Sequence, residues 1–228
     1  MKKIGIITFA IFMLKLTPAT FSQIFEIKSG VNLSTMLSKS DFDKPSDDYK
    51  LSPRLLIGVA TEFPLTELFS VESGILFSSK GYKLDLMSSL YEDSNPIHIY
   101  NKTILNYIEI PVSLKTTKLI ANIPFYATIG SYISVGLNGK KIVNELSGGI
   151  TERKEYEVKM SNSSDWDKID YGLIAGLGIQ IKRFVLGLNY SFGLANISND
   201  SSSFNYIKKN RVWGLTLGYK INLEKTSP

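Results

Sequence analysis

Large apolar residues alternate with small or polar ones along much of the chain, most clearly in FVLGLNYSFGL at residues 184–194. A period of two predicts a β-strand with two unlike faces, because successive side chains point to opposite sides of a strand. One face of this stretch carries Phe, Leu and Tyr, and the other carries Val, Gly, Asn and Ser. The second face is small and uncharged, unlike the Lys- and Glu-rich outer face of a soluble sheet.

Eight alternating segments are present, and we expect each to form one strand. They span residues 25–36, 52–63, 68–85, 103–115, 125–138, 170–181, 184–194 and 211–223. Short and long connections alternate strictly between them; the short ones are residues 64–67, 116–124 and 182–183. This order predicts an all-β fold, an eight-stranded antiparallel up-and-down barrel with its long loops at one end. We expect the charged stretch from Thr151 to Lys159 to extend the barrel strands outward as a hairpin.

Two kinds of barrel fit this pattern. A soluble lipocalin-like barrel keeps its apolar residues inside around a ligand, whereas a transmembrane barrel turns them outward to lipid. The polar faces favour the transmembrane barrel, because in the last four segments they consist largely of Gly, Ser and Thr. Glycine suits a narrow barrel interior better than an open surface. A closed barrel is also the only strand-based structure that pairs every backbone polar group in lipid.

Aromatic residues stand near segment ends on the apolar face, as in the interfacial girdles of membrane barrels. They are Phe63, Phe69, Phe125, Phe184, Trp213 and Tyr219. We expect this set to flank the short turns. On the inward face of the fourth segment, Pro111 removes a donor from the strand ladder and predicts a bulge.

The beginning of the chain has the pattern of a secretory signal peptide. Two lysines come first, the run Ile4–Leu14 is apolar, and small residues precede Gln23. The run is too short to cross a bilayer as a helix, which needs roughly 20 apolar residues. We expect residues 1–22 to be a cleaved signal peptide and residues 23–228 to form one outer-membrane β-barrel domain.

Charge and cysteine content narrow the function classes. The formal charge is +5, of which the signal segment, with three lysines and no acid, supplies three, so the rest of the chain is near +2. We therefore infer no nucleic-acid partner from the basic balance. The chain has no cysteine, which excludes disulfides and thiolate metal sites.

Several blocks resemble the PorT-like family of outer-membrane β-barrel proteins. They are GVNLST at 30–35, LNYIEIPVSLK at 105–115, PFYATIGSYISVGL at 124–137, and YGLIAGLGIQI at 171–181 followed by LGLNYSFGL at 186–194. The block YIEIPV and the closing strands with Gly-x-aromatic patterns are the most specific parts. The resemblance covers nearly the whole chain after the signal segment and implies an eight-stranded outer-membrane barrel. A named relative takes part in a secretion apparatus, so an accessory role in secretion is one implied function.

Charged residues also fall on the inward faces of the segments. They are Arg54, Glu62, Glu72, Lys80, Glu109, Lys115 and Lys220. Charges inside a barrel must be paired. Because Arg54, Glu72 and Glu109 lie on neighbouring segments, we expect an arginine–carboxylate cluster, and with Lys220 they form a candidate interior charge network. A structural network that fills the barrel is favoured over a proton or ion path.

Catalysis and metal binding have little support in the sequence. His98 is the only histidine and has no nucleophile pattern beside it, so neither a triad nor a histidine metal site is indicated. The acids of the loops lack the spacing of a calcium site. Trp166 fits either a surface contact or an anchor where a strand leaves the membrane. We predict no catalytic, cofactor-binding or metal site.

The sequence therefore favours a non-enzymatic outer-membrane protein that acts as a structural or interaction scaffold through its extracellular loops. An even number of strands places both termini on the periplasmic side. The expected partners are the lipid bilayer of the outer membrane and its insertion machinery. A narrow channel, transport or secretion-accessory barrel is the main alternative; a membrane hydrolase or acyltransferase and a soluble lipocalin-like binder are the others.

Overall fold

The computed structural model describes residues 24–39, 49–88, 97–147, 150–161, 166–198 and 207–222. Its strands are β1 (Ile24–Lys39), β2 (Tyr49–Lys50), β3 (Ser52–Pro64), β4 (Phe69–Ser88), β5 (Ile97–Ile120), β6 (Ile123–Ser147), β7 (Ile150–Val158), β8 (Ile169–Ile181), β9 (Phe184–Gly193) and β10 (Ile207–Asn222). Within these ranges, no helix has the length and apolar character needed to cross a membrane. The expected signal peptide, residues 1–22, lies outside the described residues.

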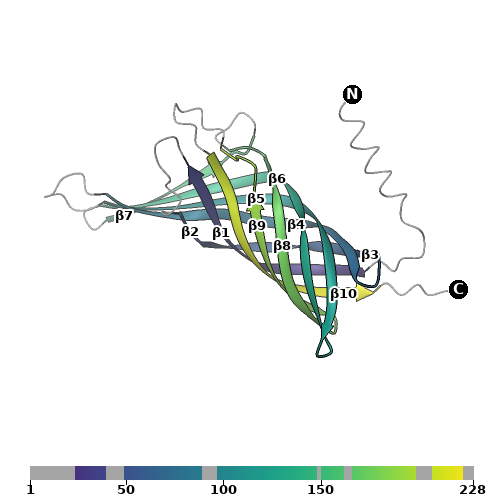
Figure 1. The fold of residues 1–228 in the computed structure, drawn as a ribbon. Coiled ribbons are helices and arrows are strands. Elements are labelled where there is room, and N and C mark those ends of the chain that lie inside the picture. The colour runs from purple at the N-terminus through teal and green to yellow at the C-terminus, as the bar shows by residue number, and fades with distance from the viewer. Residues whose placement is uncertain are drawn as a thin grey trace, which may run out of the picture.

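Eight of the strands close into a ring in which every neighbouring pair is antiparallel (Figure 1). The order around the ring is β4, β3, β1, β10, β9, β8, β6 and β5, and the pairing of β4 with β5 closes it. The first and last barrel strands pair along their whole lengths, from Ile24 opposite Asn222 to Lys39 opposite Ile207. The predicted eight-stranded up-and-down barrel is confirmed.

Short connections join the strands at one end of the barrel, here called the turn end; the opposite end is the loop end. They are residues 65–68, 121–122 and 182–183. The second is shorter than the predicted link of residues 116–124. Ala121 and Asn122 have φ angles of 49° and 64°, and a two-residue turn with positive φ matches the twist of the flanking strands. The strands therefore continue to Ile120 and restart at Ile123.

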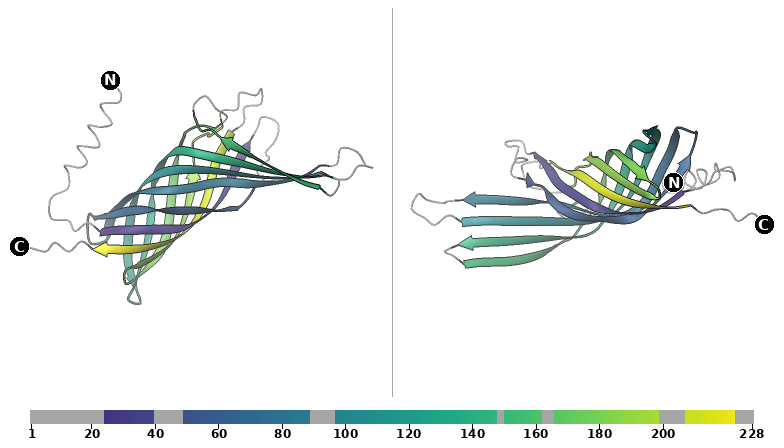
Figure 2. Two further views of the ribbon diagram at one scale, coloured as in Figure 1. Left: turned by 180° about the vertical axis from the view of Figure 1, so that it is seen from behind. Right: turned by 90° about the horizontal axis from the view of Figure 1, so that it is seen from below.

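Three barrel strands continue beyond the loop end and form a flat projection (Figure 2). Here β7 pairs with β6, from Val158 opposite Gly139 to Ile150 opposite Ser147, and β2 pairs with β4. We call this sheet of β2, β7 and the loop-end parts of β4, β5 and β6 the extension. Residues 151–159 were predicted to extend the barrel outward as a hairpin. This is confirmed, because β7 covers them as far as Val158 and pairs with the loop-end part of β6.

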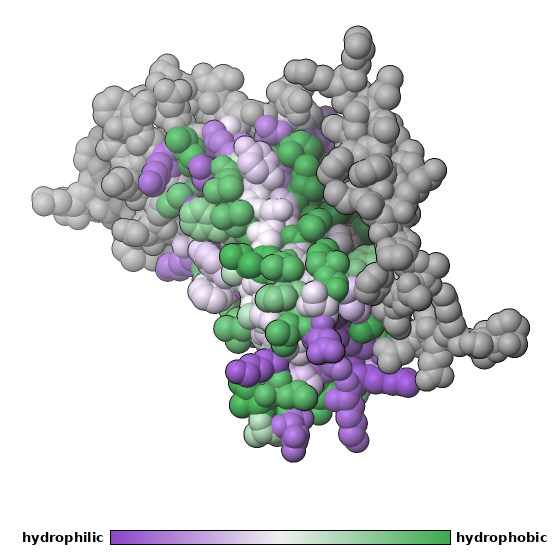
Figure 3. Space-filling model, turned by 45° about the vertical axis from the view of Figure 1, so that its right-hand side comes forward, coloured by the Kyte–Doolittle hydropathy of each residue, from purple (hydrophilic) through white to green (hydrophobic). Residues whose placement is uncertain are grey.

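The apolar faces of the barrel strands point outward. Leu186, Leu215 and Leu217 are 46%, 54% and 46% exposed, whereas Val185 and Val212 on the inward face are both 3% exposed. Figure 3 shows hydrophobic side chains across the middle of the visible face, whereas its lower end mixes hydrophilic and hydrophobic ones. The lipocalin-like arrangement, with apolar residues inside, is therefore not the one adopted.

Aromatic residues occupy two levels of the barrel rather than one. Those beside the turn end, as predicted, are Phe63, Phe69, Phe125, Phe184 and Tyr219. Trp213 lies six residues from Tyr219 along β10, about 20 Å at the usual rise of a strand. It packs against Tyr190 with ring centroids 4.6 Å apart. The prediction that Trp213 flanks a short turn was wrong, because it belongs to a second level nearer the loop end.

Pro111 interrupts the ladder between β4 and β5, where it has no partner in β4. This follows from the missing N–H of proline. Ser73 Oγ donates instead to the Pro111 carbonyl at 2.9 Å. The register shift of β5 against β6 lies between Asn106 and Tyr107, where Leu137 of β6 is left unpaired. The loss of a ladder pair at Pro111 was predicted correctly, but the bulge lies between Asn106 and Tyr107 and not at Pro111.

Replacement of an outward leucine tests the orientation of the barrel wall. We expect Leu215→Arg to destabilise the barrel by about 2–4 kcal/mol, the cost of an arginine near the bilayer midplane. Reversible urea unfolding of barrel folded into lipid vesicles measures this loss. Tyr156→Arg, on the extension, is the control and should leave stability nearly unchanged. Equal stabilities of the two variants would contradict the outward orientation.

Candidate functional site

The inward side chains of the barrel form successive layers between its two ends, and this interior is the candidate functional site. From the loop end, the layers are an apolar plug, an upper ion cluster, a small cavity, a lower ion cluster and an open vestibule. The plug and both clusters draw on strands far apart in the sequence. The interior is therefore a property of the closed ring.

The apolar plug fills the barrel at its loop end. Its buried residues are Met36, Tyr82, Leu105, Tyr107, Met160, Ala195 and Ile197. Backbone hydrogen bonds tie the loop segments across it, because Asp167 N donates to Ile197 O at 3.0 Å and Ile197 N donates to Lys208 O at 2.9 Å. Trp166 packs against the plug, with its ring 6.5 Å from that of Tyr82. This tryptophan therefore packs inward rather than anchoring an outer surface.

The upper ion cluster is centred on Lys80, which is 1% exposed. Its ammonium lies 2.7 Å from Glu109 Oε2 and 2.9 Å from Asp170 Oδ2. Asn210 Nδ2 also donates to Asp170 Oδ2 at 3.0 Å, and the ring of Tyr132 faces the ammonium at 4.2 Å. The buried lysine is thus held by two carboxylates and an aromatic face, as buried charges require.

The lower ion cluster alternates lysines and glutamates around the ring. Lys115 Nζ lies 3.0 Å from Glu62 Oε2 and 3.1 Å from Glu72 Oε2. Lys220 Nζ lies 3.0 Å from Glu62 Oε2, and Lys28 pairs with Glu72. Glu62 and Glu72 each receive two ammonium groups, and Glu26 Oε1 lies 3.7 Å from Lys28 Nζ. Three lysines thus face three glutamates, so the charges of this cluster balance and the side chains hold one another in place.

A cavity of about 50 Å³ separates the two ion clusters. Lys28 and Glu72 contribute to its wall on the lower side, and Lys80 and Glu109 on the upper side. This volume has room for one or a few water molecules. It is too small for a dissolved solute, so the interior can hold water locally without forming a continuous pore.

The vestibule is a depression of about 600 Å³ that opens at the turn end. Glu62, Gln180 and Lys220 line it where it meets the lower ion cluster, and Lys220 Nζ donates to Gln180 Oε1 at 2.8 Å. Lys118 and Lys182 stand among the lining residues from the short connections. The interior is therefore accessible from the turn end only as far as the lower ion cluster.

The predicted network is divided between these layers. Glu72 and Lys220 lie in the lower ion cluster and Glu109 in the upper one. Arg54 is inward and 9% exposed, but its described hydrogen bonds go to backbone carbonyls, with Nη1 donating to Pro53 O and Nη2 to Thr103 O. The expected pairing of Arg54 with Glu72 and Glu109 was therefore wrong.

The register of the sheet explains the position of Arg54. Leu56 of β3 pairs with Ser78 of β4, so the same register brings Arg54 to the level of Lys80. Two cations at one level repel each other in a poorly solvated interior. Lys80 pairs with the carboxylates of the upper ion cluster, and the Arg54 guanidinium donates to the Thr103 carbonyl instead.

Three charged members of the clusters were missed by sequence reasoning: Glu26, Lys28 and Asp170. Each stands on the polar face of its segment, so the period of two was the available signal. They were not recognised because each lies close to an end of its strand or among small residues, where a charge also fits a solvated position.

The acidic side chains of the described interior are paired with lysines and are not grouped as metal ligands. No group of three or more His, Cys, Asp or Glu side chains within the described ranges is arranged to hold a metal ion. The backbone of His98 lies in β5, on the extension and away from both ion clusters. The carboxylates of the interior are occupied by lysines, so their arrangement stabilises charge rather than activating a nucleophile.

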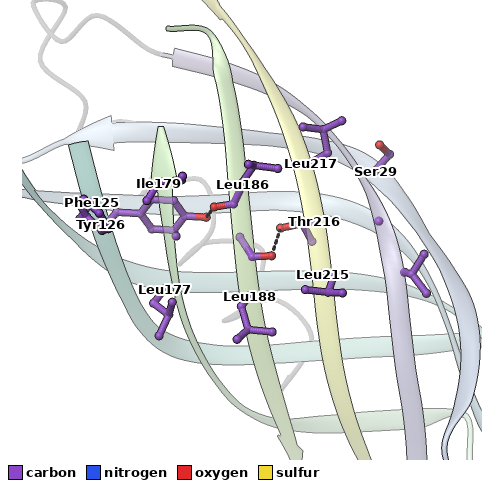
Figure 4. Close-up of a pocket in the computed structure, with 14 residues that line it drawn as sticks. Ser29, Phe125, Tyr126, Leu177, Ile179, Leu186, Leu188, Leu215, Thr216 and Leu217 are labelled. Atoms are coloured by element: carbon purple, nitrogen blue, oxygen red, sulfur yellow. Dashed lines mark hydrogen bonds between the residues drawn. The ribbon is translucent and has the colours of Figure 1, made fainter. Parts of the chain in front are cut away.

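A second depression lies on the outer, lipid-facing surface and has a volume of about 570 Å³. Figure 4 shows its leucines on β8, β9 and β10, including Leu177, Leu188 and Leu215. Glycines in the wall leave room there, and from inside the barrel Tyr126 Oη donates to the Leu186 carbonyl at 3.4 Å. Its leucine-rich lining is chemically matched to lipid tails.

A comparison with known protein families agrees with this architecture. A family model described as outer membrane protein beta-barrel domain matches residues 21–199. No curated protein matches the chain. Solved structures similar to the chain include Ail, the attachment invasion locus protein of Yersinia pestis, at 16% identity over 88% of this chain and 99% of that one, with a TM-score of 0.36. OprG from Pseudomonas aeruginosa is 12% identical over 88% and 96%, with a TM-score of 0.40.

Removal of the central lysine tests the upper ion cluster. We expect Lys80→Met to destabilise the folded barrel by about 3–5 kcal/mol, because Glu109 and Asp170 would face each other without a cation. The midpoint and slope of denaturant unfolding in vesicles measure the loss. Lys140→Met is the control, since its ammonium pairs with Glu155 at a solvated position, and it should change the midpoint little. Similar midpoints for both variants would show that Lys80 does not hold the interior together.

Proposed function

The chain belongs to the outer membrane protein beta-barrel domain family, and on that premise we propose that it is a non-enzymatic outer-membrane protein that acts as a structural or interaction scaffold. The observation that carries this proposal is the closed interior. The plug, the upper ion cluster and the lower ion cluster block the barrel at three successive levels. An eight-stranded barrel of this kind has an interior that side chains just fill.

The extension supports a scaffold role on the loop-end side. It raises β7 and parts of three barrel strands beyond the barrel wall (Figure 2). Its exposed residues combine charges with Tyr156, which is 51% exposed. Charged side chains on an edge strand discourage non-specific strand pairing, so a partner would contact the faces of this sheet rather than add a strand to β7.

The proposal includes the way in which the protein reaches the membrane. Residues 1–22 would direct export and be removed, and residues 23–228 would be inserted by the outer-membrane insertion machinery. Ile24 and Asn222 lie at the same end of the barrel, which supports placing both termini in the periplasm. The extension and the long loops would then face the outside of the cell. The proposal includes no nucleic-acid partner and no cofactor.

A narrow transport or secretion-accessory barrel is the second candidate. The polar cavity and the open vestibule favour it, because together they leave only the two ion clusters and the plug to be displaced. The resemblance to PorT-like proteins supports an accessory role in secretion by analogy. This candidate requires the interior to open, whereas the scaffold does not.

Conductance in planar lipid bilayers separates the two candidates. We expect the purified barrel to insert without steady single-channel currents, because salt bridges and apolar packing fill its interior. Lys115→Met removes the shared cation of the lower cluster and is the matched variant. Steady currents in the unmodified protein that Lys115→Met alters would overturn the scaffold proposal in favour of a channel. Insertion is verified separately by the heat-dependent gel mobility of the folded barrel.

A further inference from the structure

A row of lysines crosses the extension from strand to strand. Lys50 of β2 pairs with Lys83 of β4, and Lys83 pairs with Lys102 of β5. Residues directly opposite each other in a sheet share a face, with Cβ atoms about 5 Å apart. The three ammonium groups are thus carried by one face of the sheet, in an arrangement that ordinarily disfavours strand pairing.

Two lysines of this row, Lys83 and Lys102, have no anionic partner among the residues that the structure describes. Beyond the backbone ladder, the side chains of Lys83 and Lys102 form no hydrogen bond or ion pair with any residue that the structure describes. Partial burial and then the positive charges of Arg54, Lys83 and Arg153 lower the pKa of Lys102. Lys50 has a further interaction of its own, so the mutual repulsion is concentrated at Lys83 and Lys102. An anion bound there would relieve it.

The row lies just beyond the apolar band of the barrel wall. On β5, the residues of the outward face from Leu114 to Ile104 are apolar except for Asn106, whose amide donates to Asn138 Oδ1 at 2.8 Å, and Lys102 follows at the next position on that face. The ten residue steps from Leu114 to Ile104, on strands tilted by about 40°, span about 25 Å along the membrane normal. This equals the height of the apolar band in outer-membrane barrels. Lys102 therefore stands at the level of the lipid headgroups.

We propose that Lys83 and Lys102, with Lys50 beside them, bind the phosphate groups of anionic lipids in the leaflet on the loop-end side. Their position favours a lipid over a dissolved anion, because the face that carries the row continues the lipid-facing surface of β4 and β5. Long lysine side chains can rest on apolar surface while their ammonium groups reach the headgroups. This proposal depends on the proposed position of the barrel in the membrane. It does not depend on whether the barrel interior conducts ions.

Retention of defined lipids by the detergent-solubilised full-length barrel tests this site. Native mass spectrometry counts the molecules of dioleoylphosphatidylglycerol or dioleoylphosphatidylcholine that remain bound after equal additions. We expect the unmodified protein to retain more of the anionic lipid. In Lys83→Gln/Lys102→Gln, the affinity for that lipid should fall by about fivefold for each lysine removed. Binding of phosphatidylcholine should not change.

The control removes the same charge from the neighbouring strand. Lys140→Gln/Lys141→Gln loses two lysines on β6, one of which is already paired with Glu155 at 2.7 Å, and should retain the anionic lipid as the unmodified protein does. Equal losses in both double variants would overturn the proposal in favour of general charge attraction. Competition by inorganic phosphate at millimolar concentration would overturn it in favour of a dissolved anion. Heat-dependent gel mobility verifies that every variant is folded, independently of its lipid binding.

Discussion

The pairing of every backbone N–H and C=O group in a lipid environment is the constraint on which the rest of this structure depends. Lipid offers no hydrogen bonds, so strands can cross it only when no edge is left open. The pairing of β1 with β10 and of β4 with β5 removes the edges. Closure with eight strands makes the interior narrow, and narrowness selects small inward residues. Gly178 opposite Gly187 is an example, since the Tyr126 hydroxyl reaches the wall beside them.

Closure also decides how charge is accommodated. A charge inside a narrow barrel has little water, so it must find an opposite charge on another strand or, as Arg54 does, backbone carbonyls that accept its hydrogen bonds. Lys80 meets Asp170 across 90 residues of sequence, and Lys220 meets Glu62 across 158 residues. The resulting clusters hold the barrel wall together from inside and close its passage at the same time. Beyond the lipid this constraint no longer applies, and the strands of the extension carry charges on open faces, including the lysine row.

The barrel strands could be predicted because their signal is local. Alternation of apolar and small residues along residues 184–194 is enough to identify a strand and assign its two faces. The inward positions of Glu72, Lys115 and Lys220 follow from the same period. The partners do not follow, because they depend on the stagger between strands. Arg54 was paired wrongly for this reason: adjacency of segments says nothing about the level at which a side chain enters the interior.

The amino-acid sequence by itself determined the number of barrel strands, the end at which the short turns gather and the face of each strand that meets lipid. These properties repeat every two residues or depend on segment spacing, and a slip of one residue would reverse a whole face. Only the tertiary structure decided which charges meet, that Met36, Leu105 and Ile197 gather into a plug, and that Trp213 stands at a second aromatic level. Those features arise from the register and tilt of strands around a closed ring, which no single segment encodes.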